Sequence, residues 1–235
     1  MKKILLLSVI SCFIVSGLVY ASPVGNPSKP LLASEEMPFS AGAEFDFVFE
    51  RELDVADMDM SIENLFLYTA KLSYTLEKRV DFYCLLGVAS GELSWEASGL
   101  DLSIDTEAAF AWGLGATVFL YEFDNGLRLG ADGNFRMTEP SLDTVIDADL
   151  EYSEWQIALA VSKQIDKFIP YGGIKYSDVK VELTVPGLGS EDTNSDNLFG
   201  IFLGCDFLVD DNLSFGLQGR FIDETALSIQ GTYRF

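Results

Sequence analysis

The sequence repeats one pattern about ten times: apolar and polar residues alternate over short segments of the chain. Residues 39–50 show it clearly, because Phe45 and Phe47 fall on one face while Glu44 and Asp46 fall on the other. Successive side chains of a β-strand point to opposite faces, so strict alternation predicts strands with one apolar and one polar face. The same rule holds at about residues 65–76, 81–90, 107–121, 127–137, 146–162, 168–183, 199–207, 213–221 and 227–235. The chain is therefore predicted to be all-β.

The connections between these segments alternate in length. Short turns are expected near residues 77–80, 122–126, 163–167 and 209–212, and long acidic loops near 51–64, 91–106, 138–145 and 184–196. The last connection, near 223–225, is short although it falls on the long-loop rim. Short turns on one rim and long loops on the other predict a closed antiparallel up-and-down barrel of about ten strands, with eight as the alternative. Within residues 146–162 the alternation slips near Ser153, which predicts a β-bulge.

Three features place the apolar face of this barrel outside, in lipid, and not inside as in a soluble calyx. The polar faces mix glycines with long charged side chains, as a narrow interior filled by side chains requires. The segments have the roughly ten residues that a tilted strand needs to cross a bilayer. Aromatic residues gather at both strand ends, as in the girdles of membrane barrels. They are Phe49, Phe66, Phe110, Trp155 and Phe221 toward the long loops, and Tyr74, Phe82, Tyr121, Phe168 and Phe207 toward the short turns.

The chain ends on an aromatic residue, Phe235, two positions after Tyr233. A sheet edge with unpaired N–H and C=O groups cannot face hydrocarbon. The final strand is therefore expected to pair with the first strand up to its last residue. A barrel closed in this way has no open sheet edge, as a transmembrane barrel requires.

The same ending resembles the closing strand of bacterial outer-membrane β-barrels. "FIPYGGIKYSD" and "LSYTLEKRVDFYCLLGVA" are similar to strand-turn patterns of small OmpA-type barrels, and "SPVGNP" at 22–27 is similar to the mature start of chlamydial major outer-membrane porins. The resemblance implies a location in the bacterial outer membrane, in contact with outer-membrane lipid. It also implies that the barrel assembly machinery recognises Tyr233 and Phe235.

The sequence predicts three parts. Residues 1–21 have a basic start and an apolar run, and predict a signal peptide cleaved after Ala21. A lipoprotein signal around Cys12 and an uncleaved anchor are the alternatives. Residues 22–37 are expected to form a short periplasmic leader and not a plug, and residues 38–235 the barrel, with no further domain.

Composition narrows the function. The chain carries 37 acidic and 15 basic residues, a formal net charge of −22, which excludes nucleic acid as a partner. It has no histidine, and the barrel hydrolases that resemble this fold use a histidine, as a serine nucleophile does. We therefore expect no enzymatic activity and no cofactor. A carboxylate hydrolase built from Glu44, Asp46 and Asp132 is the alternative.

Charged residues on the polar faces are expected to form ion pairs that fill the interior. This lumenal set comprises Glu44, Asp46, Lys71, Arg128, Asp132, Arg136, Lys175 and Arg220. Asp54, Asp57 and Asp59 are candidate ligands for Ca²⁺ or Mg²⁺, although their spacing lacks the EF-hand glycine. Cys84 and Cys205 are expected on the outer face as two free thiols.

These observations predict a non-enzymatic outer-membrane barrel that is structural or forms a narrow small-solute pore. Ten strands leave an interior that side chains largely fill, whereas aqueous porins need about 16. A surface adhesin or receptor that acts through the acidic long loops is the alternative, because long loops on rigid scaffolds often carry function.

Overall fold

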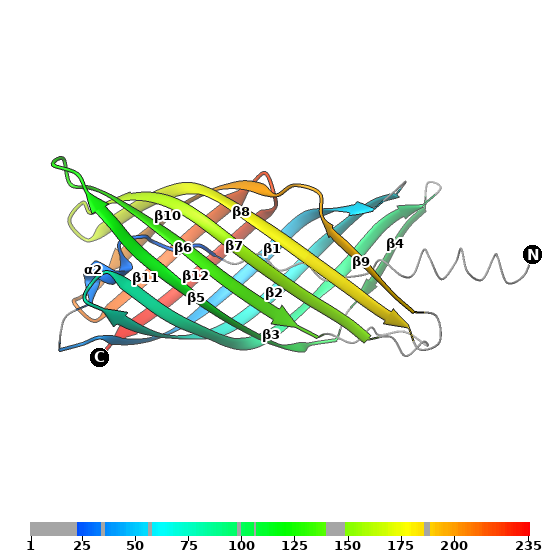
Figure 1. Cartoon of the computed structure of the whole chain (residues 1–235), viewed down its shortest axis with the longest axis horizontal. Helices are drawn as coiled ribbons and strands as arrows, with labels where there is room; N and C mark the ends of the chain where they lie inside the picture. The colour runs from blue at the N-terminus through cyan, green and yellow to red at the C-terminus, as the bar shows by residue number, and fades with distance from the viewer. Residues whose placement is uncertain are drawn as a thin grey trace, which may run out of the picture.

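The computed structural model describes residues 23–33, 36–55, 58–97, 100–105, 107–139, 149–185 and 189–235. They form an antiparallel β-barrel with one short helix (Figure 1). The elements are α2 (Lys29–Leu32), β1 (Phe39–Val55), β2 (Met58–Leu76), β3 (Val80–Ala97), β4 (Leu100–Asp105), β5 (Ala109–Glu122), β6 (Leu127–Thr138), β7 (Asp149–Lys163), β8 (Phe168–Val185), β9 (Gly189–Ser195), β10 (Phe199–Leu208), β11 (Leu213–Phe221) and β12 (Thr225–Arg234). The predicted signal peptide, residues 1–21, lies outside the described residues.

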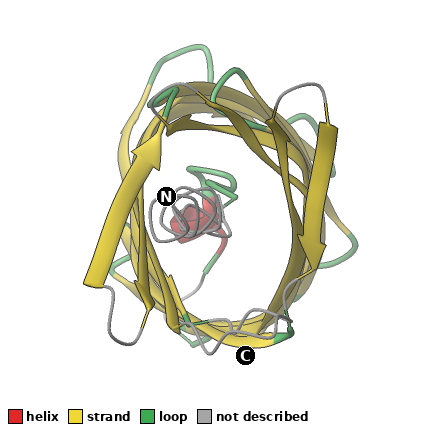
Figure 2. Ribbon diagram, turned by 90° about the vertical axis from the view of Figure 1, so that its right-hand side faces the viewer, coloured by secondary structure: helices red, strands yellow, loops and turns green. Residues whose placement is uncertain are grey.

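The barrel wall closes between the first and last strands. Strands β4 and β9 extend the wall at one end, and the other ten form the ring seen in Figure 2. Strand β12 pairs with β1 from Ala226, opposite Val48, to Arg234, opposite Ser40. Phe235 continues the pairing, since its N–H donates to the Phe39 carbonyl at 2.9 Å and its carbonyl accepts from the Phe39 N–H at 3.3 Å. The predicted ten-strand barrel, closed at its last residue, is confirmed.

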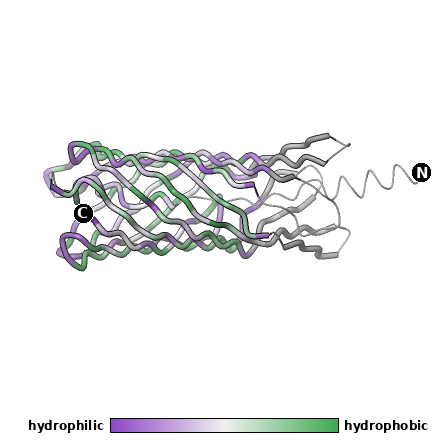
Figure 3. Tube along the Cα trace, turned by 90° about the horizontal axis from the view of Figure 1, so that it is seen from below, coloured by the Kyte–Doolittle hydropathy of each residue, from purple (hydrophilic) through white to green (hydrophobic). Residues whose placement is uncertain are grey.

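The outer surface of the barrel is apolar. Leu203 is 62% exposed, whereas its neighbour Phe202 faces the interior and is 0% exposed. Hydrophobic and hydrophilic residues alternate along the strands in Figure 3. All ten predicted girdle aromatics are exposed. The predicted orientation, with apolar side chains on the outer surface, is confirmed. No helix in the described ranges combines the length and the apolar character needed to span a membrane.

Three segments expected to be loops are β-hairpins instead. Strands β1 and β2 remain paired as far as Val55 and Met58, β3 and β4 pair across Ala97 and Leu100, and β9 pairs with β8. The prediction of loops over 51–64, 91–106 and 184–196 is therefore wrong for most of their length. These segments are rich in acidic residues and glycine, which is typical of loops. The alternation of apolar and polar residues nevertheless continues through them, as in "LDLSID". The hairpins carry the wall past the aromatic girdle.

The expected β-bulge at Ser153 is also wrong. Strand β7 keeps an unbroken register with both of its neighbours. Tyr152 is buried in the lumen, where its hydroxyl donates to Glu154 at 3.3 Å, so an inward aromatic residue produced the false change of phase. A true irregularity falls in β1 between Val48 and Glu50. It turns Arg51, an odd-numbered residue, into the lumen, where it is 1% exposed.

Residues 23–33, named here the lumenal segment, lie inside the barrel. The sequence predicts that this segment is a periplasmic leader and not a plug, whereas the structure places it in the lumen. The Gly25 N–H donates to Gln218 at 2.9 Å, the Asn26 amide donates to Asp206 at 3.0 Å, and the hydroxyl of Ser28 bonds that of Ser162. These partners lie on β11, β10 and β7. Figure 2 shows the helix within the ring of strands.

Short turns join the strands at the end that holds α2 and the C-terminus (Figure 1). In the turn between β10 and β11, the Asp210 carboxylate accepts the N–H groups of Leu213 at 2.8 Å and Asn212 at 2.9 Å. These backbone hydrogen bonds lower the pKa of Asp210. The sequence "VDDN" thus forms the turn through an aspartate that bonds its own backbone.

Two glycines make room for lumenal tyrosines. A Cβ at Gly115 would lie 2.5 Å from the Tyr83 hydroxyl and 2.6 Å from its ring carbon Cε2. A Cβ at Gly204 would lie 2.5 Å from the Tyr171 hydroxyl. Each tyrosine therefore occupies the space beside a glycine of the adjacent strand. The mixture of glycines and large side chains in the sequence reflects this packing.

We expect Gly115→Ala to lower the free energy of unfolding by about 1–3 kcal/mol, since an overpacked interior must shift. Gly133→Ala is the matched control, because a Cβ there meets only the Gln156 carbonyl, at 3.8 Å. Urea unfolding of the refolded barrel, followed by tryptophan fluorescence, measures both. Equal stability of the two variants would contradict the proposed packing.

Candidate functional site: the charged lumen

The long-loop half of the lumen is organised around Arg220 of β11. Its Nη2 lies 2.8 Å from Asp46 Oδ1 and 2.7 Å from Oδ2, and its Nε lies 2.6 Å from Glu224 Oε1. Ser228 completes this group, since its hydroxyl bonds Arg220 and donates to Asp46 at 2.7 Å. The guanidinium thus joins β1, β11 and β12. Its side chain is fully enclosed.

Two more cations extend this cluster across the barrel. Lys175 Nζ of β8 lies 2.6 Å from Asp223 Oδ2 and also contacts Glu224. Arg51 Nη1 lies 3.4 Å from Glu154 Oε1 and 3.9 Å from Glu224 Oε2. We call the seven charged residues the Arg220 network: Asp46, Arg51, Glu154, Lys175, Arg220, Asp223 and Glu224. Three cations face four acids, all with side chains at most 1% exposed.

The middle of the lumen holds a second polar group. Arg136 Nη2 donates to Glu44 at 2.9 Å. Asp132 accepts hydrogen bonds from neutral donors, at 2.6 Å from Thr117 and 3.1 Å from the Tyr83 hydroxyl. Asp132 therefore has hydroxyl partners and not a cation at ion-pair distance among the described residues.

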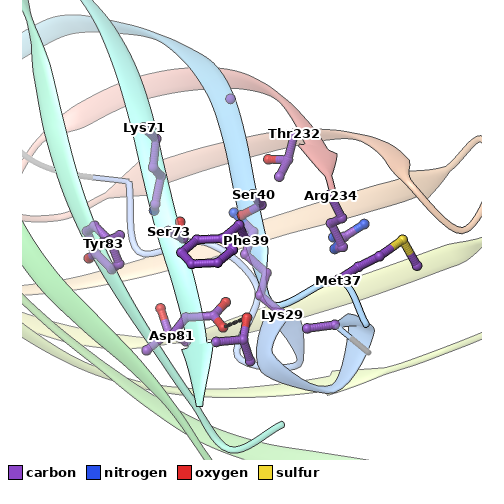
Figure 4. A pocket seen from close by; sticks show the side chains of 14 residues that line it. Lys29, Met37, Phe39, Ser40, Lys71, Ser73, Asp81, Tyr83, Thr232 and Arg234 are labelled. Atoms are coloured by element: carbon purple, nitrogen blue, oxygen red, sulfur yellow. Dashed lines mark hydrogen bonds between the residues drawn. The ribbon is translucent and has the colours of Figure 1, made fainter. Parts of the chain in front are cut away.

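The short-turn mouth carries a third group, built from Lys29, Lys71 and Arg234. Lys71 Nζ lies 3.7 Å from the centre of the Tyr83 ring, Lys29 Nζ donates to Gln230 at 2.5 Å, and Arg234 Nη2 donates to Ser214 at 3.3 Å. Figure 4 shows the three cations around one cavity. Their partners in these contacts are all uncharged.

The structure brings most of the predicted lumenal residues together, though not as one network. Asp46, Lys175 and Arg220 belong to the Arg220 network, while Glu44, Lys71, Asp132 and Arg136 line the middle and the mouth. Arg128 differs, because it lies at the short-turn rim and pairs with Glu122 at 3.3 Å. It follows the alternation but sits at the very start of β6, beyond the enclosed part of the lumen.

Sequence reasoning missed four members of the Arg220 network. Glu154 had a usable signal, since it precedes the outward Trp155 and so falls on the inward parity. Arg51 was hidden by the bulge in β1. Asp223 and Glu224 lie in a turn, where no alternation applies, and fold back into the barrel with 3% exposure each.

Other predicted sites are only partly described. Asp57, and the side chains of Asp54 and Asp59, lie outside what the structure describes. The described residues contain no cluster of three metal-ligating side chains. Cys84 and Cys205 are both free thiols.

Comparisons with known proteins point to outer-membrane porins. No family model matches the chain. The major outer membrane porin, serovar B, of Chlamydia trachomatis is 20% identical over 79% of this chain and 74% of the porin. The serovar A porin is 19% identical over 100% of this chain and 99% of the porin. The crystal structure of OprG from Pseudomonas aeruginosa matches 84% of this chain and 95% of OprG at 11% identity, with a TM-score of 0.46.

The chain is an integral β-barrel of the bacterial outer membrane. Its closed wall and apolar exterior suit lipid, and its sequence is similar to that of outer-membrane porins. The resemblance to chlamydial porins, first noted at residues 22–27, extends over much of the chain. The function of the enclosed charges is the next question.

Removal of Arg220 tests the network. We expect Arg220→Ala to destabilise the barrel by about 3–5 kcal/mol, because Asp46 would stay buried without its ion-pair partner. Arg128→Ala is the control, since an exposed pair contributes at most ~1 kcal/mol. Urea titrations of both variants in lipid vesicles measure the difference. A loss as small in Arg220→Ala as in the control would show that the network does not stabilise the fold.

Proposed function

We propose that this protein is a non-enzymatic outer-membrane barrel that keeps its lumen closed and conducts small solutes poorly. One observation carries the proposal: side chains in the centre of the lumen pack so closely that they have no surface accessible to water. Arg220, Tyr152 and Phe202 are 0% exposed although they lie inside a barrel, not in a protein core. An open aqueous pore would leave such residues wet.

Two separate barriers support this view. The Arg220 network crosses the long-loop half and ties β1, β7, β8 and β11 together through charged side chains. The lumenal segment occupies the other half, where Val24 packs in one cluster with Tyr171 and Phe202. Ten strands leave a narrow interior, so two such barriers in series restrict it along its length. The similarity to proteins named porins supports a barrel of the pore-forming type as the wall around these barriers.

The carboxylates of the lumen support a non-enzymatic function. A general base must reach a substrate proton with a free lone pair and at a suitable pKa. Glu44 faces Arg136, Asp46 faces Arg220, and Asp132 accepts bonds from Thr117 and Tyr83. Each of the three acids proposed for a hydrolase thus has a partner that holds it. Ion-pair and hydrogen-bond networks of this kind stabilise a filled barrel.

A second candidate function is surface binding. Strands β3 and β4 stay paired from Glu92 and Asp105 to Ala97 and Leu100, beyond the girdle residue Phe110. Paired strands hold a binding surface more rigidly than free loops do. Attachment of cells that express the full barrel, compared with cells whose barrel has a short turn in place of 92–105, distinguishes this function. Equal attachment to every tested surface would exclude this hairpin as the adhesive element.

Planar-bilayer recordings test the closed lumen. We expect the mature protein to show conductance steps far below those of a 16-strand porin, because its lumen is filled. Deletion of residues 23–33 should raise the conductance while the Arg220 network keeps it small. Lys78→Gln, in an exposed short turn, is the control and should leave the recordings unchanged. Large, stable openings of the intact protein would contradict the proposal.

A further inference from the structure

The cations of the lumen fall into two groups according to their partners. Four of them form ion pairs with carboxylates: Arg51, Arg136, Lys175 and Arg220. In the described part of the chain, no carboxylate lies at ion-pair distance from Lys29, Lys71 or Arg234. The three cations at the short-turn mouth therefore differ from the other four, because their direct partners are uncharged groups and not carboxylates.

A cavity of about 480 Å³, including the part open to solvent, lies among these three side chains. Figure 4 shows Lys29 of α2, Lys71 of β2 and Arg234 of β12 around the same space. The lining contains one acid, Asp81, whose carboxylate accepts a hydrogen bond from Thr75 at 2.5 Å. Hydroxyl groups of Ser40, Ser73 and Thr232 also line the cavity.

We infer that this cavity is a binding site for a phosphate group. Three cations against one acid give the lining a formal charge of +2 (three minus one). Lys29 and Lys71 repel each other in this partly buried place, and an anion between them relieves that repulsion. The inference goes beyond the proposed function and does not depend on whether the barrel conducts.

The donor set favours a tetrahedral oxyanion over a halide. The Arg234 guanidinium and two ammonium groups can each donate charge-assisted hydrogen bonds to a different oxygen. Three further acids lie behind the lining: Glu44, Asp132 and Asp206. Glu44 is paired with Arg136, and neutral donors bond the other two. Their negative charges reduce the net positive charge around the cavity, so binding depends on the direct hydrogen bonds from Lys29, Lys71 and Arg234.

The anion would also connect two parts of the protein. Lys29 belongs to the lumenal segment, whereas Lys71 and Arg234 belong to the wall. An anion that bonds all three holds the segment against the wall at the mouth. The ligand is either free phosphate or the phosphate of a lipid headgroup, since both present negatively charged, unesterified phosphate oxygens.

Calorimetric titration of the full mature barrel in dodecyl maltoside micelles tests the site, because this detergent carries no phosphate. Inorganic phosphate is added at constant ionic strength, with chloride as the balancing ion. We expect saturable binding that weakens by roughly 10-fold or more in Lys29→Gln, Lys71→Gln and Arg234→Gln, as the loss of a charged hydrogen bond predicts. Lys167→Gln, in an exposed turn, is the matched control and should bind as the parent does.

Gel mobility with and without boiling checks that each variant is folded. Lys29→Gln keeps the test decisive even if a wall variant misfolds, because Lys29 is not part of the wall. Addition of phosphatidylglycerol to the micelles separates the two sources: competition with phosphate identifies a lipid headgroup as a ligand, and unchanged phosphate binding identifies free phosphate. Absence of saturable heat, or equal binding by the parent and Lys29→Gln, overturns the inference.

Discussion

The backbone pairing between β1 and β12 is the interaction on which the rest of the structure depends. Hydrocarbon offers no hydrogen-bond partner to a backbone N–H or C=O group. An open sheet edge would therefore cost several kcal/mol for each unpaired group, so the wall must close. Phe39 and Phe235 complete this seam with reciprocal hydrogen bonds, and their rings stack at 6.4 Å on the outer surface. Closure fixes the direction of every side chain, and the apolar residues then face lipid while the charges are enclosed.

Enclosed charges are costly unless each finds a partner, and this cost explains the arrangement of the lumen. In the long-loop half, Arg220 and Lys175 share Glu224. One carboxylate in the turn before β12 thus joins this turn to β8 and β11. In the short-turn half, Gly25, Asn26, Ser28 and Lys29 of the lumenal segment form single hydrogen bonds to the wall and, among the described residues, no ion pair at close range. The barrel is therefore stabilised from within by two different kinds of contact, and both also fill its interior.

Sequence periodicity predicted the wall because lipid and lumen impose a period of two on every strand. Phe202 shows its limit, since the alternation places this residue on the lumenal face although its apolar side chain alone would suit lipid. Arg51 could not be placed from periodicity, because a bulge shifts the phase of β1. The position of residues 23–33 could not be predicted either, since it rests on bonds to four distant strands and not on any local pattern.

Those four contacts have a consequence for the order of folding. Gly25, Asn26, Ser28 and Lys29 bind groups on β11, β10, β7 and β12, which the ribosome makes long after them. The earliest-synthesised part of the described chain has no docking surface until the latest strands have assembled. Docking of residues 23–33 is thus a late step of assembly, because it needs strands from the far end of the chain in place.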